Sequence, residues 1–355
     1  MNPQKKLKVA VLFGGCSTEH EVSLTSAKFI MQSLDPDKYE LIPLYISKKG
    51  EWFYYGGELA DLSKGHHEGR SCCTPAFMSP DTGKAGVALF EKDGVRFLPV
   101  DVVFPVLHGK NGEDGTVQGL AALAKIPMVG CGLLSSALCM DKVMAKIILS
   151  AVGIPNAPYY SIKKSALKNI DVHLDEIEQK LGYPIFVKPA NAGSSVGVSK
   201  AKNREGLKTA IDLAFLHDSK VLCEKAIVGR EVECAVFGGE EPFASIPGEI
   251  EPGAEFYDYA AKYEDDTSKL YIPARIRPET TEKLREIACR AFVALDCKGL
   301  ARIDFFVTPE EEVILNEVNT LPGFTPISMY PKLMNECGYP AGVLVDRLIA
   351  LSLEE

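Results

Sequence analysis

Apolar runs long enough to cross a membrane are missing from this 355-residue sequence. The first apolar stretch, residues 9–13, ends at Gly14 and Gly15. It is also too short for the hydrophobic region of a signal peptide. We therefore expect a cytoplasmic protein that has no membrane partner.

The sequence also lacks the cysteine spacings of metal and redox sites. Its ten cysteines form no CxxC pair and no Cys/His pattern of a zinc site. Several of them, such as Cys139, Cys223 and Cys234, stand in apolar runs. We expect buried free thiols in a reducing compartment, and we assign no function to the neighbouring Cys72 and Cys73.

Positive charge is in deficit. The net charge of −9 and the pI near 5.4 argue against a nucleic-acid partner. They do not exclude a local basic groove that binds a small anion.

Two nucleotide-binding motifs are also absent. The chain has no GxxxxGK[ST] sequence. The residues after its first predicted strand, GGCSTE, lack the GxGxxG pattern that a nicotinamide-dependent dehydrogenase would need there.

What is present indicates a mixed α/β protein. Apolar strands at 8–13, 39–47 and 101–107 alternate with a helical pattern, which predicts a parallel α/β sheet in the first third. Residues 50–95 are polar and irregular, and we expect hairpins and loops there. After residue 131 the pattern predicts one long helix over 135–154, followed by antiparallel α+β structure.

A hairpin near the C-terminus combines apolar and acidic residues. The strands ARIDFFV and VILNEVN are separated by residues 309–312, and a four-residue loop would set Thr308 opposite Val313. The same register puts Asp304 opposite Glu317. Like charges directly opposite each other destabilise a sheet, so a cation is expected between them.

This register also puts Arg302 opposite Asn319, on the same face as Asp304 and Glu317. Two carboxylates and an amide oxygen are hard ligands, suited to Mg²⁺ that also holds nucleotide phosphates. A solvent-exposed acidic strand edge is the alternative. The apolar residues on either side of these positions favour the metal site.

Three glycine-containing loops are further candidates. KPANAGSSVGVS (188–199) could close its backbone N–H groups over phosphates, with Lys188 and Lys142 nearby; a hairpin tip and surface lysines are the alternative. LHGKNGEDGTVQG (107–119) and GGCSTEHE (14–21) follow buried strands, where ligands of open α/β sheets bind.

Within these loops, Glu19 or Glu21 could receive an ammonium group, unless they only stabilise the start of a helix. Of the two histidines, His108 stands beside the glycines and is the better candidate than His20.

Eight segments, in order along essentially the whole chain, resemble the D-alanine–D-alanine ligases of the ATP-grasp superfamily. They are GGCSTEHEVSL, HGKNGEDGTVQG, CMDKVMAK, VKPANAGSSVG, EKAIVGREVE, FYDYAAKY, ARIDFF and NEVNTLPGFTPISMYP. The resemblance implies an α/β N-terminal domain plus two α+β domains in an ATP-grasp fold. We place their boundaries at 1–131, 132–223 and 224–355.

The resemblance implies ATP-dependent joining of two D-alanines, by way of D-alanyl phosphate, for peptidoglycan precursor synthesis. It implies a homodimer, and two Mg²⁺ ions (or Mn²⁺) as cofactors. The residues implied for ATP are Lys142, Lys188, Ser195, Glu224, Lys225, Ile227, Glu231 and Asn316. Those implied for the metal are Asp304, Glu317 and Asn319.

The remaining implied roles concern the two amino acids. The resemblance implies catalytic roles for Glu19, Ser194, Tyr263, Arg302 and Gly323. Glu19 would bind the first ammonium group, and Arg302 with the Gly323 N–H would stabilise an oxyanion. The residues implied for substrate binding are His108, Tyr257, Lys262, Ser328 and Met329.

Two alternatives remain at this stage. A ligase of the same fold could use D-serine or D-lactate as second substrate. Tyr257, Tyr263 and Met329 are all present as in the D-alanine enzymes, whereas Ile327 stands where some members have histidine. A nucleotide-binding sensor without catalysis would not need Arg302 or Glu19.

Overall fold

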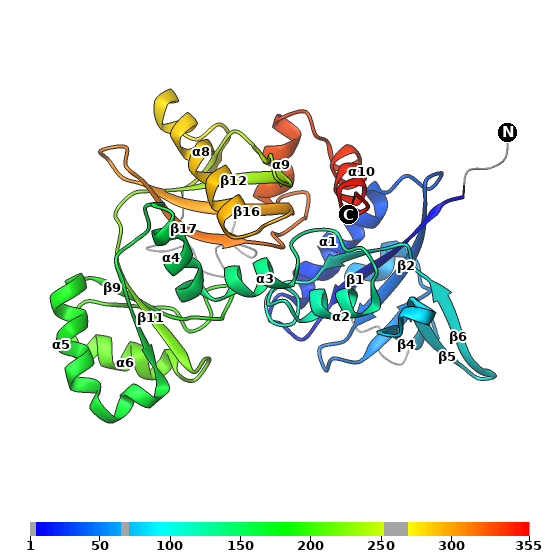
Figure 1. Ribbon diagram of the computed structural model, residues 1–355, viewed down its shortest axis with the longest axis horizontal. Helices are drawn as coiled ribbons and strands as arrows, with labels where there is room; N and C mark the ends of the chain where they lie inside the picture. The colour runs from blue at the N-terminus through cyan, green and yellow to red at the C-terminus, as the bar shows by residue number, and fades with distance from the viewer. Residues whose placement is uncertain (1–4, 65–70, 252–268, 355) are drawn as a thin grey trace.

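The described part of the chain forms three β-sheets, one of them carrying the N-terminal residues and two formed by the rest (Figure 1). The computed structural model describes residues 5–64, 71–251 and 269–354. Figure 1 shows the N-terminal sheet at one end of the molecule and the other two sheets at the opposite end. This arrangement confirms the predicted fold class of one α/β part and two α+β parts.

The N-terminal sheet has seven strands. In spatial order they are β6 (Gly94–Pro99), β5 (Gly86–Glu91), β4 (Cys73–Ser79), β3 (Trp52–Tyr55), β2 (Tyr39–Ile46), β1 (Leu7–Gly14) and β7 (Val102–Val106). Only the pairs of β1 with β2 and with β7 are parallel. The other pairs are antiparallel, and all of them involve β3 to β6. The three strands predicted at 8–13, 39–47 and 101–107 are therefore parallel as predicted, and the hairpins expected over 50–95 are confirmed. In the described residues, the connections between β3 and β6 contain the 3-10 turns η1 (Leu59–Lys64) and η2 (Thr82–Lys84), and antiparallel neighbours need no crossover helix.

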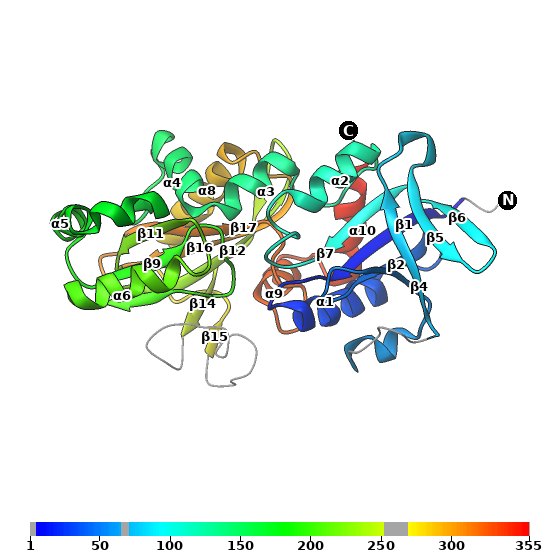
Figure 2. The same cartoon turned by 90° about the horizontal axis from the view of Figure 1, so that it is seen from below.

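Successive side chains of β1 point to opposite faces of the sheet, so the sheet has an apolar core on each face. Val9, Val11 and Phe13 pack on one face in a cluster that includes α1 (His20–Ser33) and α10 (Ala341–Ser352). Ala10 and Leu12 pack on the other face with α2 (Thr116–Ala124). The C-terminal helix α10 therefore belongs spatially to the N-terminal sheet, beside α1 (Figures 1 and 2).

The second sheet is antiparallel and has four strands. Their order is β10 (Ser199–Ala201), β9 (Ile185–Pro189), β11 (Lys220–Lys225) and β8 (Tyr159–Lys163). The turn η3 (Lys164–Asn169) and the helices α5 (Ile170–Leu181) and α6 (Arg204–Ala214) cover one face (Figure 2). The opposite face carries Lys188 and Glu224, which line the cavity described below.

The third sheet is also antiparallel. Its strands run in the order β15 (Lys269–Tyr271), β14 (Gly248–Glu251), β12 (Arg230–Gly238), β16 (Gly299–Val307) and β17 (Val313–Asn319), and β13 (Phe243–Ala244) pairs with β12. One face packs on α8 (Pro278–Ala294) through an apolar core. The two antiparallel sheets confirm the α+β structure predicted beyond residue 131.

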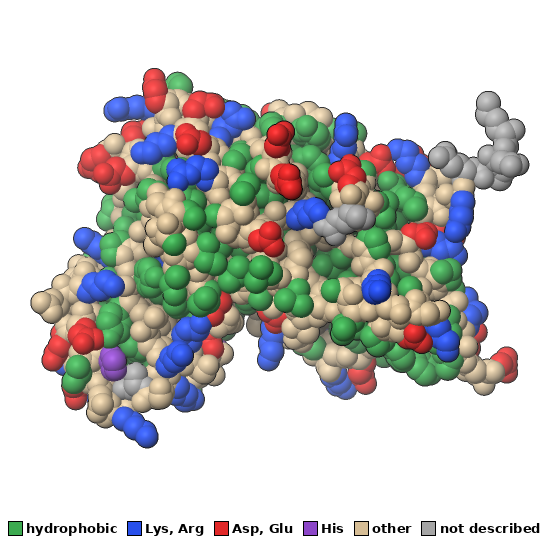
Figure 3. All heavy atoms as spheres, viewed as in Figure 1, with side chains coloured by type: hydrophobic (Ala, Val, Ile, Leu, Met, Phe, Trp, Pro, Cys, Tyr) green, Lys and Arg blue, Asp and Glu red, His purple; other side chains and the backbone are tan. Residues whose placement is uncertain are grey.

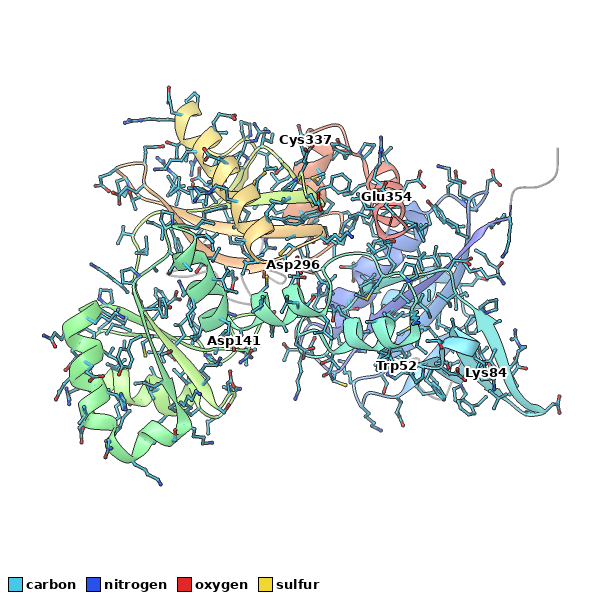
Figure 4. All side chains as sticks on the ribbon, in the orientation of Figure 1. Trp52, Lys84, Asp141, Asp296, Cys337 and Glu354 are labelled. Carbon is cyan, nitrogen blue, oxygen red and sulfur yellow. The ribbon has the colours of Figure 1, made fainter. Side chains whose placement is uncertain are left out.

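The long helix predicted over 135–154 is wrong. The structure has α3 (Leu133–Met140) and α4 (Lys142–Ala151), with Asp141 between them (Figure 4). The Asp141 carboxylate accepts hydrogen bonds from the backbone N–H groups of Val143 and Met144. An aspartate in this role begins a new helix, and the hydrophobic periodicity gave no sign of it because both helices share one apolar side.

Two further predictions concern cysteines and membranes. All ten cysteines are free thiols, and Cys139, Cys223 and Cys234 are buried as predicted. In the part of the chain that the structure describes, none of the helices has the length and hydrophobicity needed to cross a membrane.

Candidate active site

A cavity of about 440 Å³ lies between the two antiparallel sheets and reaches loops of the N-terminal sheet. All predicted site residues within the described ranges line it: Glu19, His108, Lys142, Lys188, Ser194, Ser195, Glu224, Lys225, Ile227, Glu231, Arg302, Asp304, Asn316, Glu317, Asn319, Gly323, Ser328 and Met329. The predictions for Tyr257, Lys262 and Tyr263 lie outside the described residues.

The cavity-facing side of the third sheet is acidic around one arginine. Glu233 on β12 pairs with Asp304 on β16, which pairs with Glu317 on β17. Arg302 donates two hydrogen bonds of 2.8 Å to Asp304, and its Nε lies 3.1 Å from Glu233 Oε2. Arg302 thus supplies a cation to Asp304 and Glu233, and not between Asp304 and Glu317, where the sequence predicted one.

The hairpin register is confirmed at the site and wrong at the turn. Asp304 opposes Glu317, and Arg302 opposes Asn319, as predicted. Val307 rather than Thr308 opposes Val313, because the register shifts between Asp304 and Phe305. The extra residue, a β-bulge, lies in β17 and is what the alternation argument missed.

The bulge decides which residues of β17 face the cavity. Val313 and Leu315 are buried on the α8 side, and after the bulge Val318 is buried on that side. Without the extra residue, odd-numbered positions would keep pointing into the apolar core. The bulge instead turns Glu317 and Asn319 toward the cavity.

The predicted metal ligands form a hard but incomplete donor set. Asn319 Nδ2 donates to Asp304 Oδ2 at 2.9 Å, and Glu317 Oε2 lies 3.8 Å from Lys142 Nζ. Among the residues that the structure describes, no three His, Cys, Asp or Glu side chains gather closely enough to hold a metal. Two carboxylates and an amide still fit Mg²⁺, which commonly takes one or two protein carboxylates and completes its shell with phosphates and water.

A buried ion-pair network stands at the opposite wall, on the second sheet. Glu224 lies 2.6 Å from both Lys146 Nζ and Lys188 Nζ. Burial opposes the ionisation of Glu224, but the two lysines outweigh it and lower its pKa to about 2. Lys146 was not among the predicted site residues, although its spacing of four from Lys142 places both lysines on one side of α4.

The loop between β9 and β10 has an unusual backbone. Ser194 and Ser195 both have positive φ values, of 51° and 57°. Each costs roughly 1 kcal/mol, and strain of this kind concentrates at ligand-binding segments. Lys142 Nζ donates to the Ala192 carbonyl at 2.7 Å, which ties α4 to this loop. Within the described part of the chain, the buried Ser194 Oγ has no hydrogen-bond partner.

Glu19, in the loop after β1 of the N-terminal sheet, lies beside the same serine loop. It lies between β1 and α1, where its Oε2 would be 3.5 Å from a Cβ on Gly193 and 3.4 Å from one on Gly109. Both are ordinary van der Waals distances, so this carboxylate packs against the backbone of both glycines. The N-terminal loops and the serine loop therefore meet at Glu19, beside the cavity.

His108 and Glu113 lie next to this meeting point. His108 Nδ1 donates to the Leu321 carbonyl at 3.0 Å and is 4.0 Å from Glu113 Oε1. Burial lowers the pKa of His108, so the imidazole is neutral at pH 7. Burial, with the charge of Glu19, raises the pKa of Glu113 to about 8. Glu113 was not among the predicted site residues, although it belongs to the glycine-rich HGKNGEDG loop.

The remaining predicted residues lie at the start of α9 (Met329–Glu336). Ser328 Oγ accepts a hydrogen bond of 3.1 Å from the Thr325 N–H, and Gly323 lines the cavity nearby. Met329 is buried, with its sulfur 2.7 Å from the position that a Cβ on Gly248 would take. A helix N-terminus of this kind suits a carboxylate.

Comparison with known proteins places the chain among ligases. The model "D-ala D-ala ligase N-terminus" matches residues 8–131, and "D-ala D-ala ligase C-terminus" matches residues 148–350. A D-alanine–D-alanine ligase of Caldicellulosiruptor bescii is 53% identical over 99% of this chain and 96% of its own length.

Two solved structures are also similar. The VanG D-Ala:D-Ser ligase from Enterococcus faecalis has a TM-score of 0.90 and 43% identity, over 98% of this chain and 100% of its own. The D-alanine–D-alanine ligase from Coxiella burnetii has a TM-score of 0.84 and 35% identity, over 99% of this chain and 95% of its own.

Proposed function

The chain belongs to the D-alanine–D-alanine ligase family, and from that premise we propose that it joins two D-alanines into D-alanyl-D-alanine with cleavage of ATP to ADP. The product is a precursor of peptidoglycan, and the fold is that of the ATP-grasp enzymes. One observation carries the proposal for the site. A carboxylate from the N-terminal sheet, Glu19, meets the strained serine loop in the same cavity that holds Lys188 and Arg302.

ATP binds between the two antiparallel sheets in this proposal. Glu224 and the backbone of Lys225 and Ile227 hold adenine where the chain crosses from β11 to β12, and Glu231 holds the ribose. Lys142, Lys188, Ser195 and Asn316 face the phosphates. Lysines and backbone N–H groups offset the charge on the transferring phosphoryl group.

Asp304, Glu317 and Asn319 hold two Mg²⁺ ions in the proposal, and Mn²⁺ can replace them. The metal supplies charge neutralisation at the phosphates. Arg302 now occupies both oxygens of Asp304, so metal binding requires this arginine to give up part of its contact. Glu233 remains as its second carboxylate neighbour.

The first D-alanine binds by its ammonium group to Glu19, near His108 and Ser194. The unpaired Ser194 Oγ can connect Glu19 to the serine loop. In the proposal, Tyr263 also joins the hydrogen bonds that link Glu19 and Ser194. Phosphorylation of the bound carboxylate makes D-alanyl phosphate, which the closed loops protect from water.

The second D-alanine attacks that acyl phosphate with its free amine. Arg302 and the Gly323 N–H stabilise the oxyanion of the tetrahedral intermediate. Ser328, together with Lys262, binds the carboxylate of this substrate at the start of α9. Tyr257 and Met329 complete the second site.

The choice of second substrate is the finer question, because one similar structure is a D-Ala:D-Ser ligase. Met329 is uncharged and buried, as in the D-alanine enzymes, whereas related ligases for D-lactate or D-serine often carry arginine at this position. Phosphate release from ATP, measured with D-alanine alone and with added D-serine or D-lactate, tests this choice. A rate that rises only when D-serine or D-lactate is added would overturn the proposal.

We also propose a cytoplasmic homodimer with three domains, 1–131, 132–223 and 224–355. Exposed apolar side chains lie on three neighbouring helices: Leu123 on α2, Leu133 and Leu134 on α3, and Met144 and Ile147 on α4. Figure 3 shows apolar side chains gathered over the middle of this face. Apolar areas of this kind support association between copies. Sedimentation analysis of Leu134→Glu beside the unmodified protein tests this: only the unmodified protein should sediment as a dimer.

A further inference from the structure

Glu224 is held by two lysines that differ in their access to the cavity. Lys188, on β9, is 16% exposed and lines the cavity where phosphates are proposed to bind. Lys146, on α4, is 3% exposed and contacts Glu224 from the interior. One lysine is enough to neutralise the Glu224 carboxylate, so the second lysine can leave without leaving Glu224 unpaired.

The surroundings of Lys146 fix it in place. Its Nζ lies 3.5 Å from the Ala157 carbonyl and 5.6 Å from the centre of the Tyr159 ring, which β8 presents beside Glu224. A buried ammonium group keeps its charge only while a carboxylate pairs with it. Lys146 therefore has no other place to go, whereas Lys188 faces an open cavity.

We propose that Lys146 is a positioning residue, a fixed counter-charge that keeps Glu224 paired when Lys188 moves from Glu224 to the phosphates of the bound nucleotide. This rests on the proposed function, because it assigns adenine to Glu224 and phosphates to Lys188. It adds a residue that touches neither substrate but determines how readily Lys188 is released.

The physical reason is a difference between two states. With Lys146 present, moving Lys188 leaves Glu224 with one cation and costs one of two ion pairs. Without Lys146, the same movement leaves a buried carboxylate with no cation, which is strongly unfavourable. This cost weakens the binding only of ligands that draw Lys188 away from Glu224. It therefore weakens the binding of nucleotides with phosphates, such as ADP, and leaves the binding of adenosine unchanged.

The test is calorimetric binding of adenosine and of ADP with Mg²⁺ to the whole protein, comparing the unmodified chain with Lys146→Met. The ADP dissociation constant should rise by about tenfold or more, equivalent to at least ~1.4 kcal/mol. The adenosine constant should stay within about twofold, because Lys188 can remain on Glu224. Equal weakening of both ligands, or no change for ADP, would overturn the proposal.

Two further variants guard against a general structural effect. Lys180→Met is a matched control, because Lys180 lies 5.7 Å from the same Tyr159 ring but is exposed; it should leave both constants unchanged. In a Glu224→Gln background the carboxylate that binds Lys188 is gone. Adding Lys146→Met there should leave the ratio of the two constants unchanged, and a further tenfold change would refute the pairing argument.

Failure of this inference differs from failure of the proposed function. If the unmodified protein bound neither ADP nor ATP, the proposed function would fall. If it bound ADP and formed D-alanyl-D-alanine while Lys146→Met changed adenosine and ADP binding alike, only the role of Lys146 would be wrong.

Discussion

Replacing Glu224 by glutamine should destabilise the protein in a pH-dependent way. The two lysines at 2.6 Å lower the pKa of Glu224 from 4.5 to about 2, against the effect of burial. At about 1.4 kcal/mol per pH unit, this difference corresponds to about 3 kcal/mol of stability at neutral pH. Removing one partner of a buried ion pair costs a similar amount, about 3–5 kcal/mol.

The sign of the pH dependence follows from the lowered pKa. The stabilisation by Glu224 is fully present above pH 4.5 and is lost as the pH falls toward 2. Glutamine cannot titrate, so the unmodified protein should exceed Glu224→Gln by about 3 kcal/mol at pH 7 and by only about 2 kcal/mol at pH 3.5.

Urea unfolding at pH 7, 5 and 3.5, followed by far-ultraviolet circular dichroism, measures this difference. Fluorescence would report the wrong region, because the single tryptophan, Trp52, lies on β3 of the N-terminal sheet (Figure 4). Glu91→Gln is a suitable control, since its ion pair with Arg96 is exposed and should contribute little. A difference that stays constant from pH 7 to 3.5 would refute the pairing of Glu224 with the lysines.

Three other substitutions address the chemistry. Glu317→Gln should weaken Mn²⁺ binding, measured by electron paramagnetic resonance, and lower Mg²⁺-dependent turnover by about 10²-fold; an unaffected enzyme would refute the metal assignment. Arg302→Ala should lower kcat by about 10²–10³-fold in a coupled ADP-release assay, and intact turnover would remove its oxyanion role. Glu113 ionises as the pH rises through about 8, which adds negative charge beside Glu19, so the KM for the first D-alanine should fall between pH 6.5 and 8.5. In Glu113→Gln that KM should stay level over the same range, and an unchanged fall would show that another group titrates.

Much of the site could be predicted from the sequence because its polar residues interrupt apolar strands. The assumed four-residue loop paired Asp304 with Glu317, and the structure confirms that pairing. The turn register was wrong, since a β-bulge inserts a residue that no hydrophobic pattern reveals. The site pairing was still correct because the one-residue error at the turn and the extra residue in β17 cancel.

Other features depend on contacts between distant segments. The break at Asp141 arises from a local cap that a shared apolar side conceals. The hairpins between β3 and β6 were expected, but their joining to β2 in one mixed sheet was not predicted. Lys146 looked like any lysine on a helix, and only its contact with Glu224 from β11 distinguishes it. Such contacts join residues that are far apart in the sequence, and the hydrophobic pattern of one segment does not reveal them.

Mass spectrometry of the products formed from ATP, Mg²⁺ and an equal mixture of D-alanine, D-serine and D-lactate tests the central claim most directly. The proposed function predicts D-alanyl-D-alanine as the main product, formed together with ADP and phosphate. A main product of D-alanyl-D-serine or D-alanyl-D-lactate, or ATP cleavage without any dipeptide, would contradict it.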